Sequence, residues 1–332
     1  MFFCKKGIMI TLKQAQDIVT EQVDKLKLND RPVELYEPIN YILSIGGKRI
    51  RPVLTLIACS MYSENIKPAL MPAIGMEMFH NFTLIHDDIM DNANVRRSRP
   101  TVHAKWNNNV GILSGDAMCI KAYDYVMQCP PSVFSDIFWI FNRTALQVCE
   151  GQQFDMNFEK RDDVSLYEYL HMIELKTAVL LAACLQIGSL IGGASKKDSE
   201  ILYKYGLNVG MAFQLQDDLL DVYGEEALFG KETGKDIISN KKTFLLIKAL
   251  QTAEGDTLSS LKQWLSLAKF DAKEKVSAVR GIYDQLNIRK ETQQAILRYF
   301  SEADTLLGSL AVDNSKKTEL QIFADQIKKR IF

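Results

Sequence analysis

The 332-residue sequence predicts an all-α protein. Apolar residues recur with helical spacing along almost the whole chain, and the apolar–polar alternation typical of half-buried strands is nearly missing. The eight prolines stand at or near the edges of the apolar runs, and the breakers between runs are short. We therefore expect one domain over residues 1–332. Several runs are long and apolar on most faces, which indicates a helical bundle around a large central cavity.

The predicted helices follow one another directly, and each is an apolar run with 3.6-residue spacing that ends at a breaker. The breakers are GG at 46–47, NANVRRSRPT at 92–101, CPP at 129–131 and GGASKKD at 192–198. The expected helices are 10–27, 36–44, 52–62, 70–91, 112–128, 133–157, 165–192, 198–223, 241–252, 257–267, 271–286, 289–306 and 315–331.

The composition argues against several classes of protein. The formal net charge is −1, whereas a general nucleic-acid binder usually carries a basic excess. None of the six cysteines has CxxC spacing, so a zinc knuckle or a thioredoxin-type site is not indicated. Scattered cysteines are typical of reduced, buried residues, and we expect a cytoplasmic protein. The start MFFCKKG is apolar before it is basic, the wrong order for a signal peptide.

One apolar run, 178–194, approaches the length of a membrane span. It contains glycines and follows Glu174 and Lys176 directly. We interpret it as a buried core helix and expect no integral membrane contact.

Two acidic clusters of the form DDxxD, HDDIMD and QDDLLD, each end a long apolar helical run. Residues four apart lie on one helix face, so Asp87 and Asp91 point the same way, as do Asp217 and Asp221. Negative charge at a helix C-terminus is opposed by the helix dipole, and a divalent cation would offset it. Mg²⁺ prefers carboxylate oxygens, whereas the loop of an EF-hand is missing. A solvated acidic helix end is the alternative, and the duplication disfavours it. The candidate metal ligands are Asp87, Asp88, Asp91, Asp217, Asp218 and Asp221.

Basic residues form compact groups near both acidic clusters. Arginine makes forked contacts to phosphate and lysine supplies a point charge. Each group alone is more typical of a solvated face, but together with the acids they predict sites for two diphosphates. One diphosphate would be bridged by metal, and the other held by cations alone. The groups are GGKRIRP with Lys48, Arg49 and Arg51; RRSRPTVH with Arg96, Arg97, Arg99 and His103; ELKTA with Lys176 and Thr177; and GKETGKDIISNKKT with Lys231, Lys235, Lys241 and Lys242.

From residue 46 to 243, this series of motifs resembles the trans-isoprenyl diphosphate synthases, the polyprenyl synthetase family. GGKRIRP, HDDIMD with RRSRPTVH, GQQFD at 151–155, KT at 176–177 and FQLQDDLLD at 213–221 stand in the family's order. The resemblance implies an all-α fold around a central cavity and a homodimer. It also implies head-to-tail prenyl transfer between isopentenyl diphosphate and an allylic diphosphate, with Mg²⁺ as cofactor, three ions per site and Mn²⁺ as a substitute.

The resemblance assigns roles by motif position. The metal set divides into main ligands (Asp87, Asp91 and Asp217), a ligand through water (Asp221) and supporting acids (Asp88 and Asp218). The isopentenyl diphosphate site matches Lys48, Arg51, His80 and Arg97. The allylic diphosphate site matches Arg96, Lys176, Gln214, Lys231 and Lys241. Thr177 and Gln214 also stabilise the allylic cation through their oxygens. Without the resemblance, His80 would be interpreted as a core histidine. Ser98 departs from the family, which often has glycine there.

The helix before Asp87 is expected to line the tunnel in which the product grows. Thr83 lies one turn back on the face of the carboxylates and Phe82 lies on its flank, with Phe79 and Met76 deeper. Phe82 beside a small Thr83 resembles short-chain members that make the twenty-carbon product. Ordinary core residues are the alternative. We expect geranylgeranyl diphosphate as the product, with farnesyl diphosphate second.

Two other functions compete with this one. A class I terpene cyclase also uses DDxxD, but its second metal motif is normally an Asn/Ser/Glu pattern, and it has no need of the group at Lys48, Arg51 and His80. A non-catalytic, prenyl-synthase-like subunit generally loses acids from one motif, whereas both are intact here.

Overall fold

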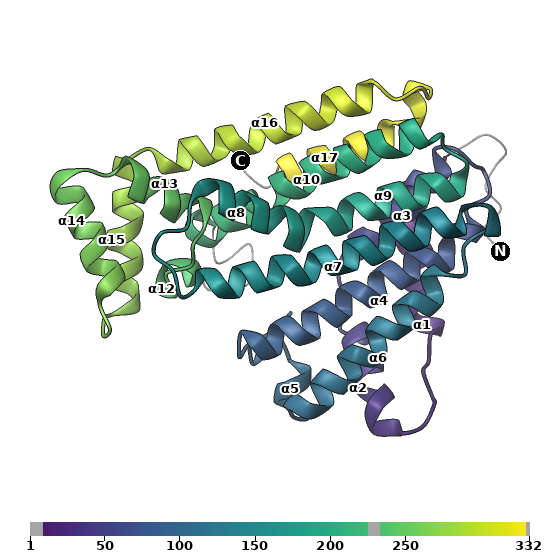
Figure 1. Ribbon diagram of the computed structural model, residues 1–332, viewed down its shortest axis with the longest axis horizontal. Helices are drawn as coiled ribbons and strands as arrows, with labels where there is room; N and C mark the ends of the chain where they lie inside the picture. Colours follow the sequence, from purple (N-terminus) through teal and green to yellow (C-terminus); the bar gives the residue numbers. More distant parts are fainter. Residues whose placement is uncertain (1–8, 225–232, 330–332) are drawn as a thin grey trace. The chain divides into compact units, whose positions relative to one another are not determined.

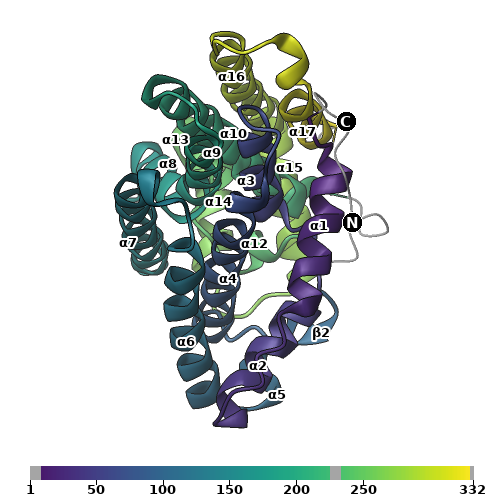
Figure 2. The ribbon, with the colours of Figure 1, turned by 90° about the vertical axis from the view of Figure 1, so that its right-hand side faces the viewer.

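The structure is a computed structural model that describes residues 9–224 and 233–329 (Figures 1 and 2). Helices dominate these residues, which confirms the all-α prediction. The chain forms two compact units. Unit 1 comprises Met1–Asn142, Ala183–Leu202 and Ala311–Leu320, and unit 2 comprises Arg143–Ala182, Tyr203–Leu310 and Gln321–Phe332. The single domain and the central cavity stay predictions.

Unit 1 is built around one long, buried helix, α4 (Lys67–Met90). Pro68 lies in its first turn, where the missing N–H costs least. Helix α6 (Asn108–Val126) runs beside α4 in both views (Figures 1 and 2). The two approach closely because a Cβ at Gly75, Gly111 or Gly115 would collide with the facing helix. The remaining helices of unit 1 are α1 (Leu12–Lys25), α2 (Val33–Ser44), α3 (Ile50–Ser60), α5 (Val102–Lys105), η1 (Pro131–Val133) and η3 (Asn314–Lys316).

A short hairpin follows α4. Strand β1 (Val95–Arg96) pairs antiparallel with β2 (Arg99–Pro100). The two residues between them, Arg97 and Ser98, have φ of +52° and +59°. This left-handed pair is the geometry of a tight hairpin turn.

Unit 2 holds a helix with an irregular turn. Helix α8 (Leu166–Ile173) begins at a capping box made by Ser165 and Glu168. It continues without a break through a π-helical turn, η2 (Glu174–Ala178), into α9 (Val179–Gly192). Helices α7 (Phe134–Phe158), α9 and α10 (Lys196–Tyr223) each contribute residues to both units. The other helices of unit 2 are α12 (Lys235–Ile238), α13 (Phe244–Thr252), α14 (Gly255–Ser266), α15 (Ala272–Gln285) and α16 (Ile288–Gly308), with most of α17 (Thr318–Lys328).

The long helices agree with the sequence to within a few residues. The hairpin, α5 and α12 were not predicted, and the π-helical turn lies inside a run expected to be regular. Among the described residues, one segment, Leu166–Gly192, is long and apolar enough by composition to cross a membrane. Its most apolar 18-residue window is 72% buried inside the protein, as in a core helix.

Candidate functional site

The first acidic cluster lies at the C-terminal end of α4, in unit 1. Asp87 is half-buried, and Asp91 is exposed and caps the helix. Asp88 is buried, and the Nε of Arg96 donates to both of its oxygens at 2.9 Å. Burial raises the pKa of Asp88, while the Arg96 guanidinium opposes that rise. Asp88 therefore ties the hairpin to α4, which is a supporting role.

Four arginines surround His80, which lies on α4 about two turns before Asp87. Arg49 forms a buried ion pair with Glu77, 2.6 Å between Nη1 and Oε1. Arg97 donates to the carbonyl of Gly46, and its guanidinium lies against Gly47, where a Cβ would overlap it. Both glycines have a positive φ, +80° for Gly46 and +137° for Gly47. A residue with a side chain would adopt these backbone angles only with strain. The loop thus holds arginine heads close to its own backbone.

The electrostatics of this arginine cluster favour an anion. Burial, and then Arg51, Arg97, Arg96 and Arg49, hold the pKa of His80 well below its usual range. Burial also lowers the pKa of Arg51. The Nε of Arg51 is buried and has no hydrogen-bond partner among the described residues. An unsatisfied buried donor is costly, and a phosphate oxygen would satisfy it. Lys48 is exposed at the edge of the cluster.

The second acidic cluster lies in the last turns of α10, in unit 2. Asp217 and Asp221 are half-buried and Asp218 is buried. Asp218 accepts hydrogen bonds from the hydroxyl of Tyr169 and from Nε2 of Gln214, the latter at 3.0 Å. Burial raises the pKa of Asp218. By accepting these two hydrogen bonds, Asp218 fixes the orientation of the side chains of Tyr169 and Gln214.

Gln214 continues this network to the π-helical turn. Its Oε1 accepts from Oγ1 of Thr177 at 3.0 Å. These hydrogen bonds connect Thr177, Gln214 and Asp218, and they hold side-chain oxygen atoms from two helices of unit 2 in fixed orientations. The two residues assigned to the allylic cation are in direct contact.

Two lysines meet at Asp155. The Nζ of Lys176 lies 2.6 Å, and that of Lys241 4.0 Å, from Oδ2 of Asp155. Burial alone would raise the pKa of Asp155, but the charges of Lys241 and Lys176 lower it below its ordinary value. Asp155 was part of the motif GQQFD but was not predicted as a site residue. It brings together two lysines that are 65 residues apart in sequence (241 minus 176).

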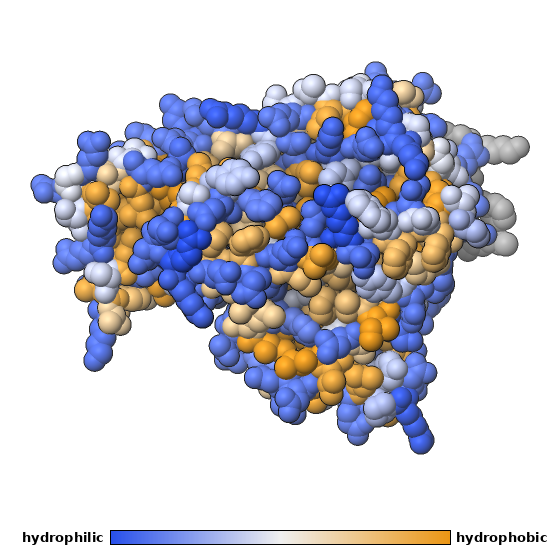
Figure 3. All heavy atoms as spheres, viewed as in Figure 1, coloured by the Kyte–Doolittle hydropathy of each residue, from blue (hydrophilic) through white to orange (hydrophobic). Residues whose placement is uncertain are grey.

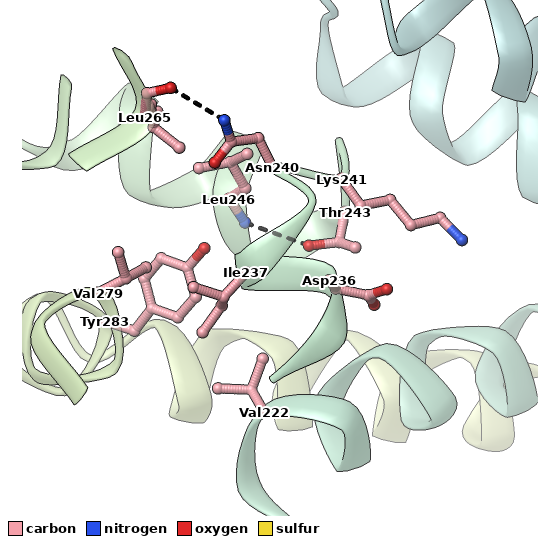
Figure 4. A pocket seen from close by; sticks show the side chains of 10 residues that line it. All are labelled: Val222, Asp236, Ile237, Asn240, Lys241, Thr243, Leu246, Leu265, Val279 and Tyr283. Carbon is pink, nitrogen blue, oxygen red and sulfur yellow. Dashed lines mark hydrogen bonds between the residues drawn. The ribbon is translucent and has the colours of Figure 1, made fainter. Parts of the chain in front are cut away.

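A fifth acid, Asp236, joins this region. The backbone N–H of Asp236 donates to Oδ2 of Asp221 at 2.9 Å. Burial raises the pKa of Asp236, and the nearby charges of Asp218, Asp221 and Asp155 raise it further against the opposing effect of Lys241. In Figure 4 the carboxylate of Asp236 and the amine of Lys241 extend to the same side, away from Val279 and Tyr283. Lys231 lies outside the described residues.

The arrangement of the acids suits Mg²⁺ that is only partly coordinated by the protein, rather than a metal ion that is coordinated by protein side chains alone. Among the described residues, no three His, Cys, Asp or Glu side chains converge as a ready-made metal site. Mg²⁺ is usually bound by one or two carboxylates together with water and substrate phosphates. Buried carboxylates that crowd one another, as around Asp236, would also be stabilised in their charged form by a nearby cation. The donor set therefore suits Mg²⁺ that arrives with a diphosphate.

Sequence reasoning missed four residues that organise these surroundings. Asp155 stood in a recognised motif, and Asp236 follows Gly234 and Lys235 in a lysine-rich stretch, so both had a weak signal. Tyr169 and Glu77 look like ordinary helix residues. Their roles follow only from the three-dimensional contacts.

Comparison with known proteins gives a consistent result. The family model for polyprenyl synthetase matches residues 32–283. The geranylgeranyl diphosphate synthase of Methanosarcina mazei is 40% identical over 242 residues, 72% of this chain and 75% of that protein. The short chain isoprenyl diphosphate synthase of Methanocaldococcus jannaschii is 37% identical over 264 residues, 79% of this chain and 80% of that protein.

Solved structures agree with the sequence comparisons. A crystal structure of a geranylgeranyl pyrophosphate synthase superposes with a TM-score of 0.93 and 44% identity, covering 97% of this chain and 99% of that chain. The enzyme of that name from Pyrococcus horikoshii gives a TM-score of 0.89 at 30% identity, covering 96% and 97%. With the family model over most of its length and relatives at this identity, the chain belongs to the polyprenyl synthetase family.

Proposed function

We propose that this chain is a trans-prenyltransferase that joins isopentenyl diphosphate head-to-tail to an allylic diphosphate and makes geranylgeranyl diphosphate. The observation that carries the proposal is the arginine cluster around His80, with the unsatisfied Nε of Arg51. A terpene cyclase binds one diphosphate and has no need of this second anion site. A non-catalytic subunit would have no need of two intact acidic clusters.

Unit 1 supplies the proposed isopentenyl diphosphate site. Arg51 and Arg97 would bind the diphosphate oxygens in forked fashion, with Lys48 as an exposed point charge at the edge. His80, held neutral by its surroundings, would donate one N–H without adding charge. These contacts hold the diphosphate and leave the double bond of isopentenyl diphosphate to react.

Unit 2 supplies the lysines proposed for the allylic diphosphate. Lys176 and Lys241, held together by Asp155, would bind the leaving diphosphate, with Lys231 and Arg96 as further candidates. As the allylic C–O bond breaks, the oxygens of Thr177 and Gln214 would stabilise the positive charge on the prenyl group. A new C–C bond forms to isopentenyl diphosphate, and the proton then lost passes to the released pyrophosphate.

Members of the family depend on Mg²⁺. Asp87, Asp91 and Asp217 are proposed as its main ligands and Asp221 as a ligand through water, with Asp88 and Asp218 supporting. When bound, Mg²⁺ supplies positive charge that favours departure of the diphosphate. Three ions per site and replacement by Mn²⁺ belong to this proposal. So do the homodimer and the cytoplasmic location.

The decisive experiment is an assay of the purified chain with isopentenyl diphosphate, Mg²⁺ and each allylic primer in turn. The products are identified as alcohols after phosphatase treatment. Geranylgeraniol is the expected main product, and chelation of the metal is expected to abolish turnover without unfolding the protein. A farnesol-only product would support the farnesyl alternative. A cyclic hydrocarbon would support the cyclase, and turnover only with an added subunit would support the partner function.

A further inference from the structure

Helix α15 contains a buried lysine that the proposed chemistry does not use. Lys275 is 0% exposed, and its ammonium donates to a carbonyl and an amide oxygen of the described residues rather than to a carboxylate. Burial lowers its pKa. A buried ammonium without a carboxylate costs free energy unless hydrogen bonds compensate. Its contacts therefore show what it stabilises.

Lys275 holds the turn that follows α12. Its Nζ donates to the carbonyl of Ile238 at 3.2 Å and to Oδ1 of Asn240 at 2.6 Å, and lies 4.1 Å from the centre of the Phe270 ring. Asn240 in turn donates through Nδ2 to the carbonyl of Leu265, at the end of α14, at 2.9 Å (Figure 4). Asn240 has a left-handed φ of +56°, which asparagine tolerates better than most residues. We call Lys275 and Asn240 the clamp.

The segment held by the clamp is anchored to the acidic cluster at its other end. Gly234 and Asp236 donate their backbone N–H groups to the carbonyl and the carboxylate of Asp221, at 2.6 Å and 2.9 Å. A Cβ at Gly234 would collide with Val276, the neighbour of Lys275 on α15. Both ends of the segment are therefore fixed, one by α10 and the other by α15.

This segment carries Lys241, one of the lysines proposed for the allylic diphosphate, which lies near Asp155. Lys241 directly follows Asn240, and its backbone N–H donates to the carbonyl of Asp236 at 2.8 Å. Figure 4 shows the heads of Lys241 and Asp236 on one side, and the apolar Ile237, Val279 and Tyr283 on the other. A shift of the turn at Asn240 would therefore move the ammonium of Lys241 away from Asp155.

We propose that the clamp of Lys275 and Asn240 is a positioning device for the allylic diphosphate site. It fixes the backbone that carries Lys241, although neither of its side chains touches substrate. The inference rests on the proposed function, because it assigns the segment to the allylic rather than the isopentenyl diphosphate.

The test uses Lys275→Met, which keeps the length and apolar stem of the side chain, and Asn240→Gly, which keeps the left-handed backbone. Lys273→Met is the matched control, because Lys273 lies on the same helix and is exposed. Three quantities are measured on the full chain: hydrogen exchange of the amides at 235–243, the affinity for inorganic pyrophosphate with Mg²⁺ by calorimetry, and KM for each substrate.

Both clamp variants are expected to exchange faster at 235–243 and to bind pyrophosphate more weakly. KM for the allylic substrate should rise on the order of tenfold, because small misplacements at a charged site cost this much. KM for isopentenyl diphosphate should match that of Lys273→Met. The double variant should be little worse than the more severe single one, because both changes break the same contact.

The inference would be overturned if the clamp variants matched Lys273→Met in hydrogen exchange at 235–243 and in affinity for pyrophosphate. Equal rises in KM for both substrates would also overturn it, because they would indicate a general loss of structure. If Lys275→Met does not fold, Asn240→Gly decides. If the unmodified chain shows no turnover, the proposed function fails, while exchange and pyrophosphate affinity still decide whether the clamp positions an anion site.

Discussion

His80 illustrates how the surroundings of one residue set its chemistry. From the residues alone it would be interpreted as a core histidine, and only the family resemblance assigns it to the isopentenyl diphosphate site. In the structure, burial and Arg51, followed by other arginines of the cluster, lower its pKa well below the usual range. A histidine kept neutral offers one donor and no charge. In the arginine cluster, His80 therefore offers one hydrogen-bond donor in a fixed direction, while the arginines supply the positive charge.

This depressed pKa predicts a dependence of stability on pH. In the unfolded chain histidine titrates near pH ~6.5, whereas folded His80 stays neutral. As the pH falls through that value, the unfolded state binds a proton that the folded state does not, so folding weakens. The titration of His80 should lower the free energy of unfolding by up to about 1.4 kcal/mol for each pH unit below that value. Thermal melts from pH 8 to pH 5 should show a smaller decline for His80→Gln than for the unmodified chain.

The exposed His171 provides the control for these melts. His171→Gln tests whether replacing any histidine has this effect, and the decline should be smaller in His80→Gln than in His171→Gln. An identical decline in His80→Gln would contradict the depressed pKa.

Phe82 is the residue expected to limit the product. Its ring centre lies 5.4 Å from that of Phe79 and 4.8 Å from that of His86. Phe79 in turn lies 5.4 Å from Phe141. Phe82 is thus the second ring of an aromatic row that runs from His86, next to Asp87, through Phe82 and Phe79 to Phe141. We predict that Phe82→Ala lengthens the product, because a large side chain is removed while the second layer of rings remains.

Product alcohols from Phe82→Ala and Phe82→Leu are compared by chromatography. Leucine retains most of the bulk, and its products should stay close to those of the unmodified chain. An unchanged spectrum in Phe82→Ala would show that the floor of the tunnel lies elsewhere.

At the scale of elements, the π-helical turn depends on a single glycine of α7. A Cβ at Gly151 would collide with the backbone of Leu175 and Lys176. Backbone cannot rotate away as a side chain can, so the turn itself would have to move. Irregular π turns are frequent at functional sites, and this one carries Lys176 and Thr177. We predict that Gly151→Ala destabilises the fold by about 1–3 kcal/mol and lowers kcat.

Gly281→Ala is the matched control, because Gly281 lies inside α15 and a Cβ there meets nothing within 4 Å. It should stabilise the protein by up to about 1 kcal/mol and leave turnover unchanged. Denaturant unfolding and steady-state assays distinguish the two variants. Normal kcat in Gly151→Ala would show that the turn accommodates the methyl group.

The sequence predicts the long helices well because their apolar faces repeat over many turns. It does not predict the hairpin at 95–100, since two-residue strands show no alternation and the turn residues Arg97 and Ser98 lack the usual Asn-Gly signal. The irregular geometry of η2 is set by its contact with Gly151, which no local pattern records. The roles of Asp236 and Tyr169 likewise depend on partners distant in sequence.

At the scale of the molecule, each compact unit repeats one design. A long helix ends in two adjacent aspartates, of which the second is buried and tied to a polar partner: Arg96 for Asp88, and Tyr169 with Gln214 for Asp218. The first stays half-buried, as Asp87 and Asp217 both do. This explains why the duplicated motif needs both acids. One orients the helix end, and the other remains a candidate for the metal.

Unit 1 also exposes several large apolar side chains on α6 and α7, and exposed apolar patches often mark interaction sites. Leu113 and Ile120 of α6 are 61% and 66% exposed, and Phe138 and Trp139 of α7 are 45% and 60% exposed. Figure 3 shows hydrophobic side chains gathered over the part of unit 1 that includes α6. A surface of this kind suits a second copy of the chain, which is the homodimer expected from the family.

We predict that the chain sediments as a dimer and that Ile120→Asp with Trp139→Asp makes it a monomer, because burying two carboxylates in an apolar interface is strongly unfavourable. Leu297→Asp is the control. Leu297 of α16 is an apolar residue with 45% exposure in unit 2, and its replacement should leave the dimer intact. Sedimentation velocity at several concentrations measures the outcome, and circular dichroism verifies that the variants are folded. A dimer that survives the double replacement would place the interface on another face of the protein.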